Sequence, residues 1–373
     1  MVAISWEQAL AWRMRRHLLD PVGRHSVAEV VGRLCGVQAQ VASSAELAVR
    51  VRRETSRSGD VERALREGRL VKTWAMRGTL HLLRPEEAGT YLSLMASGRS
   101  WERPSWQRYF GVTTKEIDML RRTARAALAD GPLTREELIA AVRARRGLRH
   151  VADALGESWG TLLKPLAWNG DLCHGPSRGN RVTFVRPEDA SSRWAGLPEP
   201  DDAAPVAMAA YLRAYGPTTF EAFGNWLAGG YFGKRQLRTW FATLEDRLAE
   251  VDVEGERAYV LEEDLDELVM TRPSTAVRLL PGFDQYVLGA GTADGRVVPA
   301  SRRAAVSRQA GWISPVVIVG GVVRGTWDMA EGQVRVAWFR EAGKPPRRAL
   351  RAEVTRLSSI SGRDLRPVIE AVG

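Results

Sequence analysis

The chain has 373 residues, of which 45% are hydrophobic, and a net charge of +10. No stretch approaches the roughly 20 consecutive apolar residues of a membrane span, and the N-terminal "MVAISWEQALAWRMRRHLLD" lacks the basic start, apolar core and small-residue cleavage site of a signal peptide. We therefore expect a cytoplasmic protein of two or three compact units that does not contact membranes.

Cysteine and histidine content argues against metal chemistry. The two cysteines make neither a disulfide framework nor a metal cluster, and the five histidines show no ligand spacing. We expect no metal and no cofactor. The positive charge favours a polyanionic partner, above all nucleic acid, although the Ala, Gly and Arg richness that a GC-rich genome produces is an alternative explanation.

The first third of the chain predicts helices. Ser26 and Glu29 form a capping box before "VAEVVGRLCGV", and Ser43 or Ser44 is the expected N-cap of a helix in "SSAELAVRVRR". A helical stripe of large apolar residues opens the chain: Trp6, Leu10, Met14 and Leu18. Further along, "VKTWAMRGTLHLL" predicts a strand–turn–strand hairpin that bends at Gly78.

The middle of the chain repeats one order of elements: helix, Gly-Pro break, capped helix, third helix and hairpin. The first copy breaks at Gly131-Pro132, passes through a helix in "GESWGTLLKPLAWNG" and ends in the hairpin "DLCHGPSRGNRVTFV". The second breaks at Gly216-Pro217 and ends in "AEVDVEGERAYVL". This is the element order of a winged helix, and the N-terminal third resembles a looser copy.

The last hundred residues predict mostly β structure. A hairpin turns at Gly320-Gly321, "QVRVAWFR" alternates as a further strand, and "SGRDLRPVIEAV" is predicted to close the chain as a helix. Four domains follow, each with its expected boundaries: an N-terminal winged-helix-like unit at 1–110, winged helices at 111–195 and 200–272, and a β-rich domain at 273–373.

Two neutral amides, Gln38 and Gln40, stand out in "CGVQAQV" because the stretch is otherwise apolar. In a helix, residues two apart diverge by about 200°, whereas in an extended segment they share a face. The pair lies between two predicted helices, where the backbone can leave helical geometry. Ordinary polar filler or the capping of a helix end is the alternative.

Five blocks occur in order over most of the chain: "GVQAQ", "TWAMRGTLHLL", "GPTTFEAFGNWL", "LLPGFDQYVLG" and "GVVRGTWD". Together they resemble the AlkZ-like winged-helix DNA glycosylases, the family of AlkZ and YcaQ. The resemblance implies an α+β fold in which tandem winged helices form a concave DNA channel beside a β-rich C-terminal domain. It also implies excision of N-alkylated purines, in some members from interstrand crosslinks, by a Gln-x-Gln or Gln-x-Asp motif.

The resemblance assigns the catalytic motif to Gln38 and Gln40. Gln at the second position matches the AlkZ branch, which is often linked to self-resistance against DNA-alkylating natural products, rather than the YcaQ branch. Neutral amides suit this chemistry, because an alkylated purine is already cationic and leaves readily; a positioned water and a stabilised oxocarbenium-like sugar suffice. No lysine lies in the segment, so we expect a monofunctional glycosylase without a Schiff base.

The predicted hairpin around Gly78 supplies the first candidates for DNA contact. Arg77 is expected to bind phosphate, and His81 is expected near the cleft, although His81 could instead satisfy a buried carbonyl. Trp74 and Trp101 are considered for base stacking, with packing in the core as the alternative.

Two further segments supply basic or polar candidates. Arg178 and Asn180 lie at the tip of the hairpin "GPSRGN", where a wing would track a groove and where a solvated turn is the alternative. Lys234 and Arg235 belong to the basic segment "GKRQLR", which could also be a solvated helix face. Asp284, in "LLPGFDQYVLG", is interpreted as a packing residue and only secondarily as a cleft residue.

These observations predict a monomeric enzyme that acts on double-stranded DNA carrying alkylated purines, in base excision repair or in self-resistance to a DNA-alkylating antibiotic. A non-catalytic winged-helix regulator is the main alternative, but no dimerisation helix or small-ligand domain is evident. A protein that sequesters the alkylating agent without releasing a base is a third.

Overall fold

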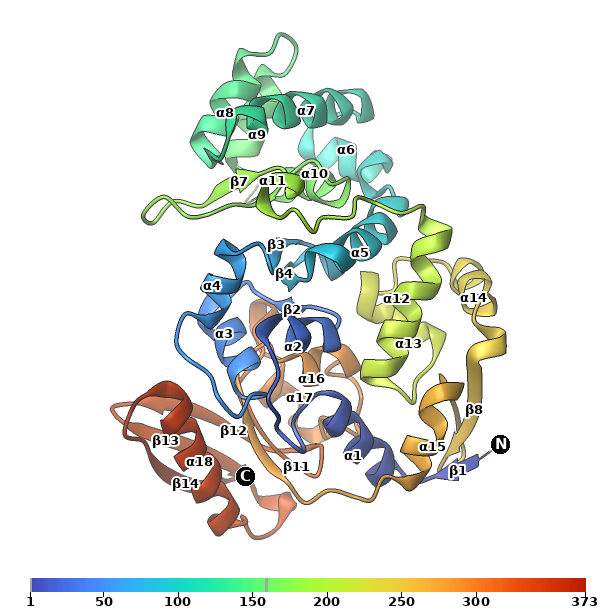
Figure 1. Ribbon diagram of the computed structural model, residues 1–373, viewed down its shortest axis with the longest axis vertical. Helices are drawn as coiled ribbons and strands as arrows, with labels where there is room; N and C mark the ends of the chain where they lie inside the picture. Colours follow the sequence, from blue (N-terminus) through green and yellow to red (C-terminus); the bar gives the residue numbers. More distant parts are fainter. Residues whose placement is uncertain (1, 158–159) are drawn as a thin grey trace. The chain divides into compact units, whose positions relative to one another are not determined.

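The computed structural model describes residues 2–157 and 160–373, which form two units (Figure 1). The first unit contains the chain up to Val61 together with Met208–Trp226 and Phe241–Gly373. The second contains Glu62–Ala207 and Leu227–Trp240. The sequence-derived segment 273–373 lies in the first unit and 111–195 in the second, while 1–110 and 200–272 each contribute to both.

Helices and strands are both abundant, as expected for the α+β class. In the first unit the helices are α1 (Trp6–Arg16), α2 (Val27–Arg33), α3 (Ala42–Arg50), α15 (Glu262–Met270), α16 (Gln285–Ala290), α17 (Arg303–Val306) and α18 (Arg347–Ser361). Its strands are β1 (Val2–Ile4), β2 (Val37–Gln38), β8 (Leu248–Val253), β9 (Glu256–Leu261), β10 (Val277–Leu280), β11 (Val316–Val319), β12 (Val322–Ala330), β13 (Gln333–Phe339) and β14 (Arg366–Val372).

The second unit combines helices with short strands. Its helices are α5 (Pro85–Ser97), α6 (Pro104–Phe110), α7 (Thr114–Ala127), α8 (Arg135–Ala144), α9 (Arg149–Glu157), α10 (Lys164–Trp168) and α11 (Pro187–Ala190), and its strands are β3 (Val71–Trp74), β4 (Leu80–Leu83), β5 (Leu133–Thr134), β6 (Cys173–His174) and β7 (Thr183–Val185). Four helices contribute residues to both units: α4 (Asp60–Arg66), α12 (Pro200–Tyr215), α13 (Phe220–Ala228) and α14 (Lys234–Ala242).

A sheet with strand order β10-β11-β12-β13-β14 organises the C-terminal part of the first unit (Figure 1). Successive side chains of a strand point to opposite faces, and both faces of this sheet are apolar. On one face Val317 belongs to a cluster with Leu350 and Val354 of α18. On the other face Ile318 belongs to a cluster with Leu10 of α1. Because both faces are covered, the strands are rich in valine and isoleucine on both sides.

The end of the chain differs from its predicted form. In "SGRDLRPVIEAV" only Ser361 is helical, as the last residue of α18; the second half is β14, which pairs in parallel with β13 from Gln333↔Arg366 to Phe339↔Val372. The helix lies earlier, in α18, and ends at Gly362, whose φ of 67° stops helical propagation. Pro367 lacks an amide hydrogen, and this disfavours a helix across "LRPVIEAV".

The predicted hairpins are present. β3 and β4 are antiparallel, with Val71 opposite Leu83 and Trp74 opposite Leu80, and β11 and β12 flank Gly320-Gly321. The sheet of the second unit places β4, β3, β6, β7 and β5 side by side in that order.

The repeated element order is also present. After Gly131-Pro132 the chain enters β5, which pairs with β7, and continues into α8 and α9. After Gly216-Pro217, Thr218 bridges Tyr259 of β9 before α13 and α14 follow. The prediction of a single helix in "GESWGTLLKPLAWNG" is wrong: α9 ends at Glu157, Gly160 has a left-handed φ of 84°, and α10 starts only at Lys164. Residues 158 and 159 lie outside the described residues.

In the part of the chain that the structure describes, no helix is long and apolar enough to cross a bilayer, and no group of three or more His, Cys, Asp or Glu residues is arranged to hold a metal ion.

Candidate active site at the glutamine pair

A sharp bend between α2 and α3 carries the glutamine pair. The capping box of Ser26 and Glu29 starts α2 as predicted. After α2, Cys35 and Gly36 both adopt left-handed backbone angles, with φ of 56° and 100°. The Gly36 amide donates to the Val31 carbonyl at 2.9 Å, which closes the helix end and turns the chain into β2.

The two carboxamides meet. Gln38 Nε2 donates a hydrogen bond to Gln40 Oε1 over 2.9 Å. Gln38 is 6% exposed, whereas Gln40 is exposed to solvent. The expectation that residues two apart share a face in an extended segment is therefore confirmed for this pair.

Helix capping does not explain the pair. The N-cap of α3 is Val41, and the helix starts at Ala42, so the predicted N-cap at Ser43 or Ser44 is wrong. Both serines lie in the first turn, where free amide groups tolerate small polar residues. Among residues 2–157 and 160–373, neither carboxamide is hydrogen-bonded to a backbone group at a helix end.

A buried tyrosine fixes the end of α2. The Tyr215 hydroxyl donates to the Leu34 carbonyl at 2.9 Å, one residue before the left-handed turn. Tyr215 packs edge-on against His17, with ring centroids 4.9 Å apart. Burial, together with the nearby Arg52 and Arg13, holds the pKa of His17 well below its ordinary value, so this ring is neutral at physiological pH.

A buried ion pair fixes the end of α3. The Arg52 guanidinium donates to both carboxylate oxygens of Asp284, at 2.6 and 2.8 Å, and both side chains are fully buried. Arg52 also donates to the Ala48 carbonyl within α3 and to the His17 carbonyl. Asp284 caps α16 by accepting from the Tyr286 amide. Asp284 is thus a packing residue, as its primary interpretation stated.

Residues 37–41 contain no titratable side chain, so the bend presents two neutral amides. Helices α2 and α3, which flank the bend, are each fixed by a buried contact. A carboxamide offers both a donor and an acceptor without the desolvation cost of a buried charge. Such a pair can orient a water and place an oxygen dipole beside a developing positive charge.

Comparisons with known proteins find similar chains at the level of family, sequence and structure. Residues 31–360 match the family model described as "DNA glycosylase AlkZ-like". The "Interstrand DNA cross-link repair glycosylase" of Streptomyces sahachiroi is 48% identical over 365 residues, with 98% of each chain covered. The solved structure of the Streptomyces sahachiroi DNA glycosylase AlkZ matches with a TM-score of 0.96 and 47% identity over the whole of both chains.

The chain belongs to the AlkZ-like DNA glycosylases.

These enzymes are hydrolases that act on N-glycosyl bonds. In this AlkZ-like chain the hairpin "TWAMRGTLHLL" places Arg77 at its tip with a φ of 55°, half-buried, on the wall of a cavity described below. His81 is fully buried, and its Nδ1 lies 2.9 Å from the Thr79 carbonyl oxygen. A fully buried ring cannot touch a phosphate, so this placement favours the alternative in which His81 satisfies a buried carbonyl.

The remaining candidates for DNA contact are exposed. Arg178 lies at the tip between β6 and β7 and forms an ion pair with Glu137 at 3.0 Å, and Asn180 is exposed beside it. Lys234 and Arg235 form the exposed start of α14.

The two tryptophans considered for stacking are buried. Trp74 is 9% exposed and packs on His174, at a centroid distance of 4.9 Å, while Trp101 is 5% exposed. Both belong to the interior of the second unit, as the alternative stated.

Sequence reasoning missed the residues that hold the bend. Tyr215 lies far from the glutamines in the sequence, and Arg52 lies beyond α3. Neither residue belongs to a recognisable motif. Two separate features of the sequence give a weak signal for the ion pair. One is the aspartate of "FDQY" at an N-cap position, and the other is the arginine-rich end of the helix "SSAELAVRVRR".

Proposed function

We propose that this protein is a monofunctional DNA glycosylase that hydrolyses the N-glycosidic bond of cationic N-alkylated purines, namely N7-alkylguanine or N3-alkyladenine. The hydrogen bond between Gln38 and Gln40 carries the proposal, because it holds two neutral amides together at one point of the bend. The helices on both sides of this bend are anchored by Tyr215 and by the ion pair of Arg52 and Asp284.

The substrate explains why neutral groups suffice. Alkylation at N7 or N3 places a positive charge on the purine, so the leaving base needs no general acid. In the proposed step, a water oxygen bonds to C1′ of the deoxyribose while the C1′–N9 bond breaks. The bonding electron pair returns to the purine and neutralises it, and the proton of the water passes to solvent.

The glutamines act as positioning groups for that water. Their carbonyl oxygens accept hydrogen bonds from it and face the oxocarbenium-like sugar, whose charge they stabilise as fixed dipoles. A buried carboxylate would raise a desolvation cost that this pair avoids. No covalent intermediate with the protein is involved.

The fold supports tandem winged helices as the DNA-binding framework. In each repeat a short β segment after the Gly-Pro break pairs with the last strand of the hairpin: β5 with β7, and Thr218 with Tyr259 of β9. This helix–strand–helix–helix–hairpin order is that of a winged helix. We propose domains at 1–110, 111–195, 200–272 and 273–373, and a concave channel lined by the winged helices.

Within this framework, we propose that exposed basic and polar side chains bind the phosphates of double-stranded DNA. Arg178, Asn180, Lys234 and Arg235 are the exposed members of this set, and the half-buried Arg77 is proposed to join them. Salt-dependent binding follows from such contacts. The enzyme is proposed to act as a monomer in the cytoplasm.

The name of the Streptomyces sahachiroi relative points to interstrand crosslinks. We propose that the substrates of this protein include bulky natural-product adducts and crosslinks, and that its role is self-resistance to a DNA-alkylating antibiotic or base excision repair.

A panel of duplexes tests the proposal. Purified protein is incubated with duplexes that carry a methylated purine, a bulky N7 adduct or an N7–N7 interstrand crosslink, and released base is quantified chromatographically. The proposal predicts release of alkylated base and alkali-labile abasic sites. Binding without any base release would contradict the proposal. The protein would then be a DNA-binding regulator or a protein that sequesters the alkylating agent.

A further inference from the structure

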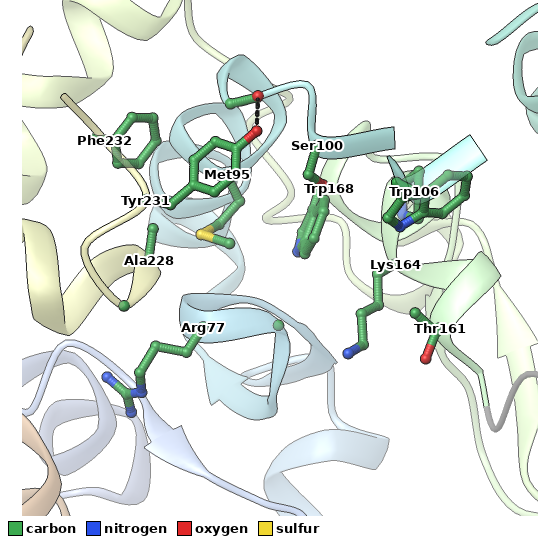
Figure 2. A pocket seen from close by; sticks show the side chains of 14 residues that line it. Arg77, Met95, Ser100, Trp106, Thr161, Lys164, Trp168, Ala228, Tyr231 and Phe232 are labelled. Atoms are coloured by element: carbon green, nitrogen blue, oxygen red, sulfur yellow. Dashed lines mark hydrogen bonds between the residues drawn. The ribbon is translucent and has the colours of Figure 1, made fainter. Parts of the chain in front are cut away.

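The second unit encloses a cavity of about 370 Å³ that the glutamine chemistry does not use (Figure 2). All of its lining residues belong to Glu62–Ala207 or Leu227–Trp240, from the hairpin tip at Arg77-Gly78, α5, α6, α10 and the segment after α13. Its volume lies near the lower end of the ~300–1,000 Å³ range of small-ligand pockets, which suits one nucleotide rather than several.

Among residues 2–157 and 160–373, two hydrogen-bond donors of the cavity wall have no acceptor. Trp168 is 8% exposed, and its indole Nε1 is buried without a hydrogen-bond partner. Among the described residues, the Lys164 ammonium has neither an ion pair nor a hydrogen bond, and burial lowers its pKa. The Lys164 ammonium points toward the open middle of the cavity in Figure 2.

Gly78 shows how close these donors are. A Cβ built on Gly78 would lie 3.3 Å from Lys164 Nζ and 3.5 Å from Trp168 Cζ2. The ammonium and the indole therefore converge on one spot at the hairpin tip. A side chain at position 78 would contact both residues, and the φ of 67° favours glycine there.

The rest of the lining defines the ligand. Aromatic rings of Trp106, Trp168, Tyr231 and Phe232 contribute to the wall, and no acidic residue lines the cavity among those that the structure describes. The Tyr231 hydroxyl is already engaged, donating to the Gly98 carbonyl at 2.8 Å. An occupant must therefore supply the hydrogen-bond acceptors and offer a flat face to the rings. A nucleotide has both, in its phosphate oxygens and its base.

We propose that this cavity binds one unpaired nucleotide of a DNA strand, with its base against the aromatic wall and a phosphate oxygen accepting hydrogen bonds from Lys164 Nζ. The inference rests on the proposed action on DNA. It deepens that function by assigning to the second unit a subsite for a nucleotide released from pairing.

A chemically intact DNA probe separates this inference from catalysis. The probe is an unmodified duplex with one bulged 2-aminopurine; the same duplex fully paired and the same bulge with an abasic linker are its references. The 2-aminopurine emission, excited outside the tryptophan absorbance, reports stacking, and fluorescence anisotropy of an end label reports affinity. We expect emission to fall on binding, with tighter binding to the bulge than to either reference.

Four variants of the full chain localise the signal. Lys164→Ala should weaken binding to the bulged duplex by about tenfold, the effect of one charge-assisted hydrogen bond, while Lys344→Ala, which removes an equal charge at an exposed position, should not. Trp168→Phe keeps a ring and should retain quenching with a smaller loss of affinity. Ala228→Phe fills the cavity from its wall and should abolish quenching without changing binding to paired duplex.

Two results would overturn the inference: unchanged 2-aminopurine emission when the parent protein is saturated with the bulged duplex, or equal binding by Lys164→Ala and Lys344→Ala. Lys164→Gln provides the same comparison if the alanine variant melts earlier than the parent. Release of alkylated base by the parent protein tests the proposed function separately. A protein that excises the base but does not prefer the bulge would refute this subsite alone.

Discussion

Removing the carboxylate of Asp284 is expected to destabilise the first unit strongly. Asp284 accepts from both terminal nitrogens of Arg52, at 2.6 and 2.8 Å, and both side chains are fully buried. Asp284→Ala leaves the Arg52 charge in the interior without its partner, a loss of about 3–5 kcal/mol. It also removes the N-cap of α16, which contributes about 1 kcal/mol.

Together these effects predict a decrease of about 5 kcal/mol in the free energy of unfolding, a large fraction of the about 5–15 kcal/mol typical of a native protein. Asp284→Asn keeps the cap and one acceptor for Arg52, so we expect a smaller loss of about 3 kcal/mol. The exposed pair of Arg66 and Glu62 gives a control: Glu62→Ala should cost about 0.5 kcal/mol or less.

Urea unfolding followed by tryptophan fluorescence and circular dichroism measures the three variants. The reasoning predicts the order Asp284→Ala, Asp284→Asn, Glu62→Ala, from most to least destabilised. An Asp284→Ala variant within 1 kcal/mol of the parent would refute it. Since the pair anchors the helix after the glutamines, folded Asp284→Asn should also excise more slowly while binding duplex normally.

Three further predictions follow from the same structure. Tyr215→Phe leaves the buried Leu34 carbonyl without its donor and should lower the free energy of unfolding by about 1–3 kcal/mol. It should also slow base release; melting and single-turnover assays measure the two effects. Parent-like values in both assays would exclude a role of Tyr215 in fixing the bend. Burial lowers the pKa of three histidines in the folded protein, to about 3 for two of them. They are His17, His81 and His174. The unfolded chain therefore binds more protons below its histidine pKa of 6.5, so stability is fully present above pH 6.5 and falls as the pH decreases toward 3. The loss at pH 5 is about 2 kcal/mol for each of His81 and His174, and His17 shifts stability in the same direction. Urea midpoints that do not change between pH 8 and pH 5 would contradict this. Arg178→Ala should weaken duplex binding and lower the slope of log K against log salt by about 1, and an unchanged slope would remove this residue from the phosphate contacts.

Local patterns in the sequence predict several short elements well. The capping box of Ser26 and Glu29, the hairpin around Gly78 and the turn at Gly320-Gly321 each depend on neighbouring residues, and all three are present. The bend at the glutamine pair follows from the same logic, because both flanking helices are visible in the sequence.

Long-range packing accounts for what the sequence does not predict. "LRPVIEAV" has an apolar run compatible with helix or strand, and only its pairing with β13 decides for a strand. Tyr215 and Asp284 hold the bend through contacts with residues far away in the chain, and such contacts leave no local pattern. His81 shows the same limit, since its burial depends on the surrounding fold.

The central claim is that the neutral pair performs the chemistry. Gln38→Ala, Gln40→Ala and the double variant are compared with the parent in single-turnover release of a cationic alkylpurine from a duplex, with duplex affinity measured in parallel. The account predicts that each single variant loses base release by about 100-fold or more, with nearly unchanged duplex binding. The double variant should be little slower than the singles, because the two amides act as one unit. Release at the parent rate by either single variant would contradict the account.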